Sequence, residues 1–201
     1  MTADEYKIVA KSLMQKLPPG PGLAIIGSAS FHQDKNRTLC THLGRSLAEI
    51  PGLFIITGGV SGVGETIGRA FFSKKVLDTE ETSIFHILPE GCGKVDYGTT
   101  FFAGANMYER REILGRMTNI YLVIEGGPGT AHEARVAIAQ NATLIPVAAS
   151  GDAALENYKM LKCPAGISMT DWRILADMQA NIEKISESIS EIMVALICEK
   201  S

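Results

Sequence analysis

The chain contains 201 residues, of which 46% are hydrophobic, and its formal net charge at neutral pH is −3. This length favours a single domain that spans residues 1–201 and encloses a sizeable core. The negative charge argues against nucleic acid and against an anionic membrane as partners, because both usually require a clustered positive field. The apolar runs are far shorter than the roughly 20 residues that span a bilayer, and the first residues do not resemble a signal peptide. We therefore expect a cytoplasmic protein.

The four cysteines, Cys40, Cys92, Cys163 and Cys198, lie far apart in the sequence. They form no CxxC pair and have no histidine at the spacing of a zinc ligand. We therefore expect neither a metal site nor a disulfide framework. Reduced thiols that pack as small hydrophobic side chains are the simplest interpretation.

Short apolar runs rich in Ile, Val and Leu have the composition of parallel strands that are covered on both faces. They lie at Leu23–Ile26, Leu53–Ile56, Ile84–Leu88, Ile120–Ile124 and Thr143–Ala148. Segments with helical spacing alternate with them, and a leading helix is expected before the segment rich in Pro and Gly at 18–22. This alternation predicts a Rossmann-like, doubly wound α/β fold whose parallel sheet has about six or seven strands flanked by helices.

The last segment, from about Asp177 to Cys198, is predicted to form one long helix. Its apolar residues alternate steps of three and four, as in a heptad seam; they are Ile182, Ile185, Ile189, Ile192 and Leu196. Two interpretations remain open at this point. The helix lies across the sheet of its own chain, or the seam forms the contact of a homodimer.

Three predicted strands end in turns of glycine and other small residues. The turns contain Gly27-Ser28, Gly58-Gly59 and Gly126-Gly127-Pro128-Gly129-Thr130. In an open parallel sheet, ligands bind outside the carboxyl ends of the strands, and glycine lets backbone N–H groups approach an anion closely. After the third turn, the next helix adds its positive N-terminus, with Thr130 as the expected cap and as a hydroxyl donor. The turns predict a site for a phosphorylated, nucleotide-like ligand; the alternative is that the glycines only make tight turns.

Two common nucleotide motifs do not fit these turns. A Walker A loop requires lysine after its last glycine, whereas Gly64 is followed by Glu65. The dinucleotide pattern G-x-G-x-x-G requires a glycine where Ile67 stands. Neither a kinase-like ATP site nor an ordinary NAD site is expected.

A more specific pattern brackets the fourth apolar run. Met107-Tyr108-Glu109-Arg110-Arg111 precedes it, and Glu125-Gly-Gly-Pro-Gly-Thr-Ala-His-Glu133 follows it. This pair resembles the signatures M-H-x-R-K and P-G-G-x-G-T-x-x-E of the LOG family of phosphoribohydrolases, within the SLOG superfamily. The register between Arg110 and Glu133 matches that of the family without insertion or deletion. The resemblance extends more weakly to the earlier glycine turns and covers roughly the first 150 residues.

The resemblance implies cleavage of the N-glycosidic bond of a nucleoside 5′-monophosphate such as an N6-modified AMP, which releases free base and ribose 5-phosphate. It makes Arg110 and Glu133 the catalytic pair, and it implies a homodimer that needs no metal or organic cofactor. Ligand and phosphate binding would fall to the residues of the glycine turns and to Arg111, which stands at the family's lysine position. These residues are Gly27, Ser28, Gly58, Gly59, Arg111, Gly126, Gly127, Gly129 and Thr130.

The chemistry of these residue types agrees with the implied roles. Glycosidic cleavage builds positive charge on the sugar ring, which a carboxylate stabilises, and a guanidinium binds phosphate or ribose oxygens in a forked geometry. Each residue also has a plainer interpretation. Glu133 could be the acid of a Thr130-x-x-Glu133 capping box, and Arg110 could be a solvated surface charge.

Two positions depart from the family pattern. Glu125 replaces a proline, and its carboxylate would either repel phosphate or turn away to pair with an arginine. Tyr108 replaces a histidine. His132 points away from its neighbour Glu133 on a helix, and we expect it to contact the core or a partner rather than to act in catalysis. These departures keep a second function open, that of a non-catalytic SLOG-type sensor of nucleotides or ADP-ribose, or a carrier of molybdenum cofactor.

Overall fold

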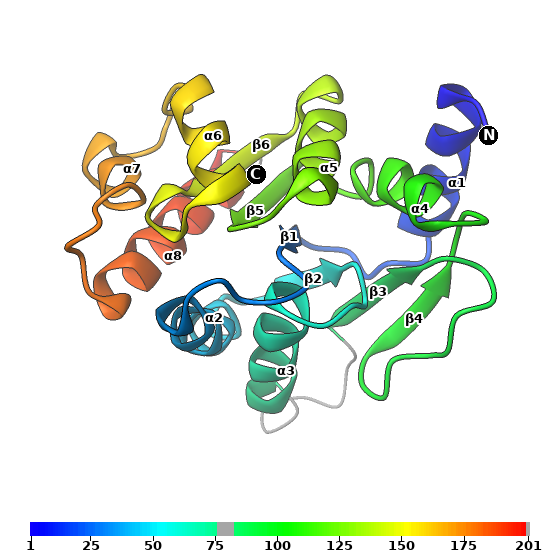
Figure 1. Ribbon diagram of the computed structural model, residues 1–201, viewed down its shortest axis with the longest axis horizontal. Coiled ribbons are helices and arrows are strands. Elements are labelled where there is room, and N and C mark those ends of the chain that lie inside the picture. The colour runs from blue at the N-terminus through cyan, green and yellow to red at the C-terminus, as the bar shows by residue number, and fades with distance from the viewer. Residues whose placement is uncertain (76–82, 200–201) are drawn as a thin grey trace.

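The computed structural model describes residues 1–75 and 83–199. Figure 1 shows the helices and strands in their spatial arrangement. In chain order they are α1 (Ala3–Met14), β1 (Gly22–Gly27), α2 (Asp34–Leu47), β2 (Phe54–Thr57), α3 (Val63–Lys75), β3 (Ile84–Leu88), β4 (Thr99–Phe102), α4 (Met107–Leu114), β5 (Ile120–Ile124), α5 (Pro128–Ala139), β6 (Thr143–Val147), the 3₁₀ turn η1 (Ala148–Ser150), α6 (Asp152–Met160), α7 (Met169–Ile174) and α8 (Ile182–Cys198).

The described strands form one six-stranded parallel sheet in the order β4-β3-β2-β1-β5-β6. All five predicted strands are present within a residue or two of their expected bounds, and the Rossmann-like α/β fold is confirmed. The sequence did not predict β4, whose half-buried residues Thr99–Phe102 lie at the edge of the sheet. In the middle, β1 lies between β2 and β5, so the chain runs outward in opposite directions on either side of β1. This reversal is the switch point at which open parallel sheets bind ligands.

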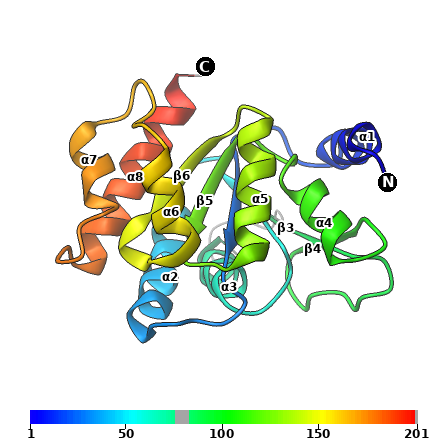
Figure 2. The same cartoon turned by 45° about the horizontal axis from the view of Figure 1, so that its top comes forward.

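Alternate side chains of the central strands serve opposite faces of the sheet. On β1, Leu23 and Ile25 pack toward α2, α3, α7 and α8, whereas Ala24 and Ile26 pack toward α1, α4, α5 and α6. Figure 2 shows these two helical layers on either side of the strands. Because both faces are covered, the strands are apolar throughout, which is why they are recognisable as uninterrupted runs in the sequence.

Helix α8 begins at Ile182 and therefore starts later than the predicted helix. Asn181 caps it, with its side-chain oxygen accepting a hydrogen bond from Lys184 N at 2.8 Å. The heptad-like seam faces the core of its own chain: Ile185, Ile189 and Ile192 are buried against α2 and the sheet. Of the two interpretations, the helix packed on its own sheet is confirmed. A homodimer stays a prediction, but these side chains cannot form its contact.

Within the described residues, no helix is long and apolar enough to cross a membrane.

Candidate functional site

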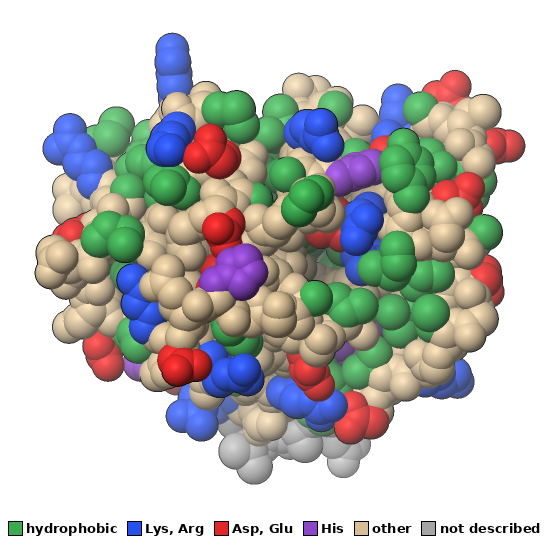
Figure 3. Space-filling view, viewed as in Figure 1, with side chains coloured by type: hydrophobic (Ala, Val, Ile, Leu, Met, Phe, Trp, Pro, Cys, Tyr) green, Lys and Arg blue, Asp and Glu red, His purple; other side chains and the backbone are tan. Residues whose placement is uncertain are grey.

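A cleft of about 240 Å³ opens at the carboxyl ends of β1, β2 and β5, at the switch point of the sheet. Figure 3 shows the face of the molecule that carries it, with acidic, basic and histidine side chains gathered about its middle. The cleft is lined by Ile25, Ile26, Gly27, Ser28, Ala29, Gly58, Val60, Ser61, Gly64, Met107, Arg110, Arg111, Leu114, Gly127, Pro128, Gly129, Thr130 and Glu133. Nine of the predicted site residues are therefore together in one place. Gly59 and Gly126 do not line it.

The third turn presents the N-terminus of α5 to the cleft. The helix is capped by the backbone of Gly127, without a side-chain cap, and Pro128 occupies its first position. Because the first N–H groups of a helix have no intrahelical acceptor, this end offers donors to an anion. Gly126 has a φ of +104°, a conformation that glycine adopts without steric cost.

The prediction that Thr130 caps α5 is wrong. Thr130 is the third residue of the helix and is buried against Gly126, because the helix starts earlier, at Pro128. Proline at the first position has its φ already set for a helix, and this favours the earlier start.

Arg110 and Glu133 form a buried ion pair at the wall of the cleft, with Arg110 Nη1 donating to Glu133 Oε1 at 2.5 Å. Arg110 projects from α4 and Glu133 from α5, and their side chains are only 3% and 7% exposed. Burial raises the pKa of Glu133, although the positive charges of Arg110 and Arg111 oppose the rise. Burial likewise lowers the pKa of the Arg110 guanidinium, against the pull of Glu133. A carboxyl group with a raised pKa is suited to proton transfer near neutral pH.

Both plainer interpretations of this pair are wrong. Arg110 is not a solvated surface charge, since it is 3% exposed. Glu133 is not the acid of a capping box, because Thr130 is not the cap and the Glu133 carboxylate bonds to Arg110.

The second turn lies against the Arg110 guanidinium. A Cβ atom on Gly58 would come within 2.8 Å of Arg110 Nη1, so any larger residue would displace the arginine. Behind the turn, Gly59 N donates to Thr57 Oγ1 at 3.0 Å, and Thr57 Oγ1 lies 2.8 Å from His86 Nδ1.

The positions of the protons in this series of hydrogen bonds follow from its last member, the bond between His86 and Tyr97. His86 Nε2 is 3.0 Å from the carbonyl oxygen of Tyr97, which can only accept, so Nε2 carries the proton. His86 Nδ1 then accepts from the Thr57 hydroxyl, and that hydroxyl accepts from Gly59 N. Burial lowers the pKa of His86, which keeps this neutral form. The sequence analysis missed both Thr57 and His86.

Arg111 lies against the first turn of α5. A Cβ atom on Gly129 would lie 2.8 Å from Arg111 Nη2, so the guanidinium rests on the first turn of α5. A positive side chain therefore flanks the free N–H groups at the start of this helix. Asn106 positions both arginines by capping α4, where its side chain accepts from Tyr108 N at 2.9 Å.

His132 and Tyr108 lie on the outer surface of α4 and α5 and do not line the cleft. His132 Nε2 is 2.6 Å from Glu112 Oε1, and the Tyr108 ring packs edge-on to the imidazole at a centroid distance of 4.9 Å. His132 therefore contacts a neighbouring helix of its own chain rather than the core, and Tyr108 remains 56% exposed.

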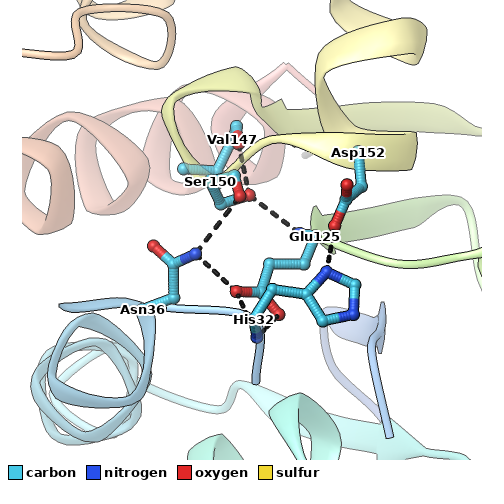
Figure 4. Close-up of polar contacts among 6 residues, drawn as sticks. All are labelled: His32, Asn36, Glu125, Val147, Ser150 and Asp152. Atoms are coloured by element: carbon cyan, nitrogen blue, oxygen red, sulfur yellow. Dashed lines mark hydrogen bonds and ion pairs between the residues drawn. The ribbon is translucent and has the colours of Figure 1, made fainter. Parts of the chain in front are cut away.

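Glu125 faces away from the cleft, as one of the two predictions held, but the arginine partner predicted for it is wrong. Its carboxylate is fully buried, does not line the cleft, and pairs with no arginine in the part of the chain that the structure describes. Instead it accepts hydrogen bonds from the Asn36 amide at 2.5 Å and from His32 N at 3.3 Å (Figure 4). The sequence offered no signal for these partners, because they lie about ninety positions away from Glu125.

Among the residues at 1–75 and 83–199, no three His, Cys, Asp or Glu side chains are close enough together to hold a metal ion. The donors that face the cleft are guanidinium, hydroxyl and backbone N–H groups, which suit an anion rather than a cation.

A family model described as the SLOG cluster4 family matches residues 21–171, a range that contains every turn of the cleft. The chain belongs to the SLOG cluster4 family. The predicted membership of the SLOG superfamily is thereby confirmed. No curated protein matches the chain significantly.

Solved structures share the fold of this SLOG protein at low sequence identity. TM1055, a structural genomics target, matches with a TM-score of 0.62 and 20% identity over 85% of this chain and 99% of that chain. DNA processing protein A from Helicobacter pylori, which has a single-stranded DNA binding mode, matches with a TM-score of 0.53 and 14% identity over 89% of this chain and 83% of its own. The molybdenum cofactor carrier protein of Chlamydomonas reinhardtii matches with a TM-score of 0.48 and 21% identity over 62% of this chain and 74% of its own. The expected exclusion of nucleic acid gains no support from these relatives.

Proposed function

We propose that this SLOG protein hydrolyses the N-glycosidic bond of a nucleoside 5′-monophosphate to free base and ribose 5-phosphate. The observation that carries the proposal is the buried Arg110–Glu133 pair in the wall of a cleft that ends at a helix N-terminus. An ordinary structural ion pair has no need to face a ligand-sized cleft beside an anion site.

The ligand's phosphate would bind at the start of α5. The first-turn N–H groups and the Arg111 guanidinium supply donors and positive charge there, and Ser28 also lines the cleft. In that position the ribose would extend toward the Arg110–Glu133 pair.

Glu133 would then act on the sugar. As the C1′–N bond breaks, its electron pair leaves with the base, and the ring carbon gains positive charge that the carboxylate stabilises. A water oxygen bonds to C1′, and the proton that it releases passes through Glu133 to the departing base. Arg110 holds the carboxylate by Nη1 in the wall of the cleft.

The test measures, by chromatography, the free base released from AMP and from an N6-modified AMP. It compares the unmodified protein with Glu133→Gln. This variant keeps the shape of the side chain but removes its charge, and we expect kcat to fall by about 100-fold or more. Glu112→Gln serves as the matched control, because Glu112 is an ion-paired acid of α4 that does not line the cleft. Calorimetric binding of AMP without base release from the unmodified protein would instead assign a non-catalytic nucleotide sensor or carrier.

A further inference from the structure

Glu125 is a buried carboxylate that neither lines the cleft nor pairs with a cation among the described residues. Asn36 Nδ2 donates to its Oε1 at 2.5 Å, and His32 N lies 3.3 and 3.4 Å from its two oxygens. The titratable group that faces it is the buried thiol of Cys40, whose pKa is raised by burial and by the Glu125 charge. A buried charge with only neutral donors costs stability relative to an apolar side chain. We therefore expect this carboxylate to act through the groups that its hydrogen bonds hold in place, and not through a gain in stability.

The backbone of Glu125 is also held in an unusual conformation. Its φ of +51° is in the left-handed region, which a residue with a side chain adopts only when its surroundings enforce it. Those surroundings come from the segment before α6: Glu125 N donates to Ser150 Oγ at 2.8 Å, and Ala153 N donates to the carbonyl oxygen of Gly126 at 2.9 Å. Proline is incompatible with this φ and has no N–H for Ser150.

Through its side chain, Glu125 links the third turn of the cleft to the first. It directly precedes the third turn, and its partners His32 and Asn36 belong to the segment after the first turn (Figure 4). The first turn in turn holds the second, because Val63 N donates to the carbonyl oxygen of Ser28 at 2.9 Å. Ser61 Oγ makes a parallel bond to the carbonyl oxygen of Ala29 at 3.0 Å.

We propose that Glu125 is a positioning residue that keeps the three turns in register for the phosphorylated ligand without touching it. The proposal rests on the function proposed above for its ligand, but the coupling between the turns is a property of the chain alone. Loss of the carboxylate frees the first turn from the third, and the loosened first turn carries the second with it. The N–H donors at α5 and the Ser28 side chain then no longer converge on one phosphate.

The experiment compares Glu125→Gly and Glu125→Gln with the unmodified protein. Glycine removes the carboxylate but adopts a positive φ without strain, so it tests the side chain alone. Glutamine keeps one oxygen as the acceptor for Asn36 and guards against a glycine variant that fails to fold. Asp152→Asn is the local control, because it alters only the exposed 2.6 Å pair between Asp152 and His32. Ile145→Val, in the core, is the control for a general loss of stability.

Two measurements are made on each variant. The first is the rate of hydrogen exchange at the amide of Val63, measured by NMR without ligand. This amide is connected to Glu125 through the hydrogen bonds of the first turn. The second is the dissociation constant of ribose 5-phosphate by calorimetry. For Glu125→Gly we expect Val63 to exchange about ten-fold faster and ribose 5-phosphate to bind about ten-fold more weakly. Smaller changes of the same sign are expected for glutamine, and unchanged values for both controls.

The outcomes separate the two proposals. Exchange at Val63 that matches the unmodified protein in both Glu125 variants overturns the positioning role. Faster exchange at Val63 in Ile145→Val as well overturns it too, because the effect is then general. If the unmodified protein does not bind ribose 5-phosphate, the proposed function fails, and exchange at Val63 alone decides the role of Glu125.

Discussion

Buried polar groups lie both in front of the cleft turns and behind them, and the two sets are bonded differently. In front, Arg110 and Glu133 are oppositely charged, line the cleft, and leave Arg110 Nε without a partner among the described residues. Behind, Glu125 and His86 are bonded on each polar side-chain atom by neutral groups. The front set is therefore incompletely bonded within the described residues. The rear set is saturated, and it therefore fixes the geometry of the turns.

The largest effect on stability is expected from breaking the front pair. Arg110→Met leaves the buried Glu133 carboxylate without its counter-charge, and we expect the free energy of unfolding to fall by about 3–5 kcal/mol, as measured in urea. The double variant Arg110→Met/Glu133→Gln removes the orphaned charge as well and should recover at least half of the loss. If Arg110→Met alone lowers the free energy of unfolding by less than a surface substitution does, water already solvates the pair.

A rear-set substitution should cost less. Thr57→Val keeps the shape of the side chain but leaves Gly59 N and His86 Nδ1 without their partner. Urea unfolding is expected to show a loss of about 1–3 kcal/mol. Thr41→Val is the matched control, since the Thr41 hydroxyl donates to the carbonyl oxygen of Arg37 in its own helix, α2. Equal losses of unfolding free energy in the two variants would contradict a special role for the hydrogen bonds of Thr57 with Gly59 and His86.

The rear set should also make stability depend on pH. Because burial lowers the pKa of His86 in the folded protein, the unfolded chain binds a proton first as the pH falls below about 6.5. The stability contributed by His86 is therefore complete above that pH, and declines by up to about 1.4 kcal/mol per pH unit until the folded protein is protonated too.

The measurement is urea unfolding at pH 7.5, 6.5 and 5.5, with His86→Asn for comparison. Glu133 acts in the opposite sense, since its raised pKa lets the folded protein bind a proton first. Only the difference between the two proteins therefore isolates the histidine. Parallel pH profiles in the two would disprove the assignment.

The smallest effect is expected where the rear network reaches the surface. His32 Nδ1 and Asp152 Oδ2 are 2.6 Å apart, but their side chains are 53% and 42% exposed. An exposed pair of this kind contributes less than about 1 kcal/mol and is screened by salt. Asp152→Asn should therefore leave urea unfolding nearly unchanged in 0.5 M salt. A larger loss of unfolding free energy would show that this pair contributes as much as the buried groups do.

Much of the candidate site was predictable because it depends on local pattern. The glycine turns follow apolar runs, and all parallel strands present their carboxyl ends at one edge, so the turns had to converge. The resemblance to the LOG signatures implied that Arg110 and Glu133 act as a pair, and their side chains do meet, at 2.5 Å. Gly59 and Gly126, also predicted to bind ligand, do not line the cleft, because sequence does not show which residues of a turn face it.

The sequence by itself determined the strands, their apolar faces and the edge at which the site forms, since these follow from composition and periodicity over a few neighbouring residues. Only the tertiary structure decided the direction of particular side chains. It buried the seam of α8 in its own chain, enclosed Glu125 among His32 and Asn36, and joined His86 to the second turn. These contacts link residues far apart in the chain, and a carboxylate or an imidazole carries no local signal of which distant donor or acceptor will meet it.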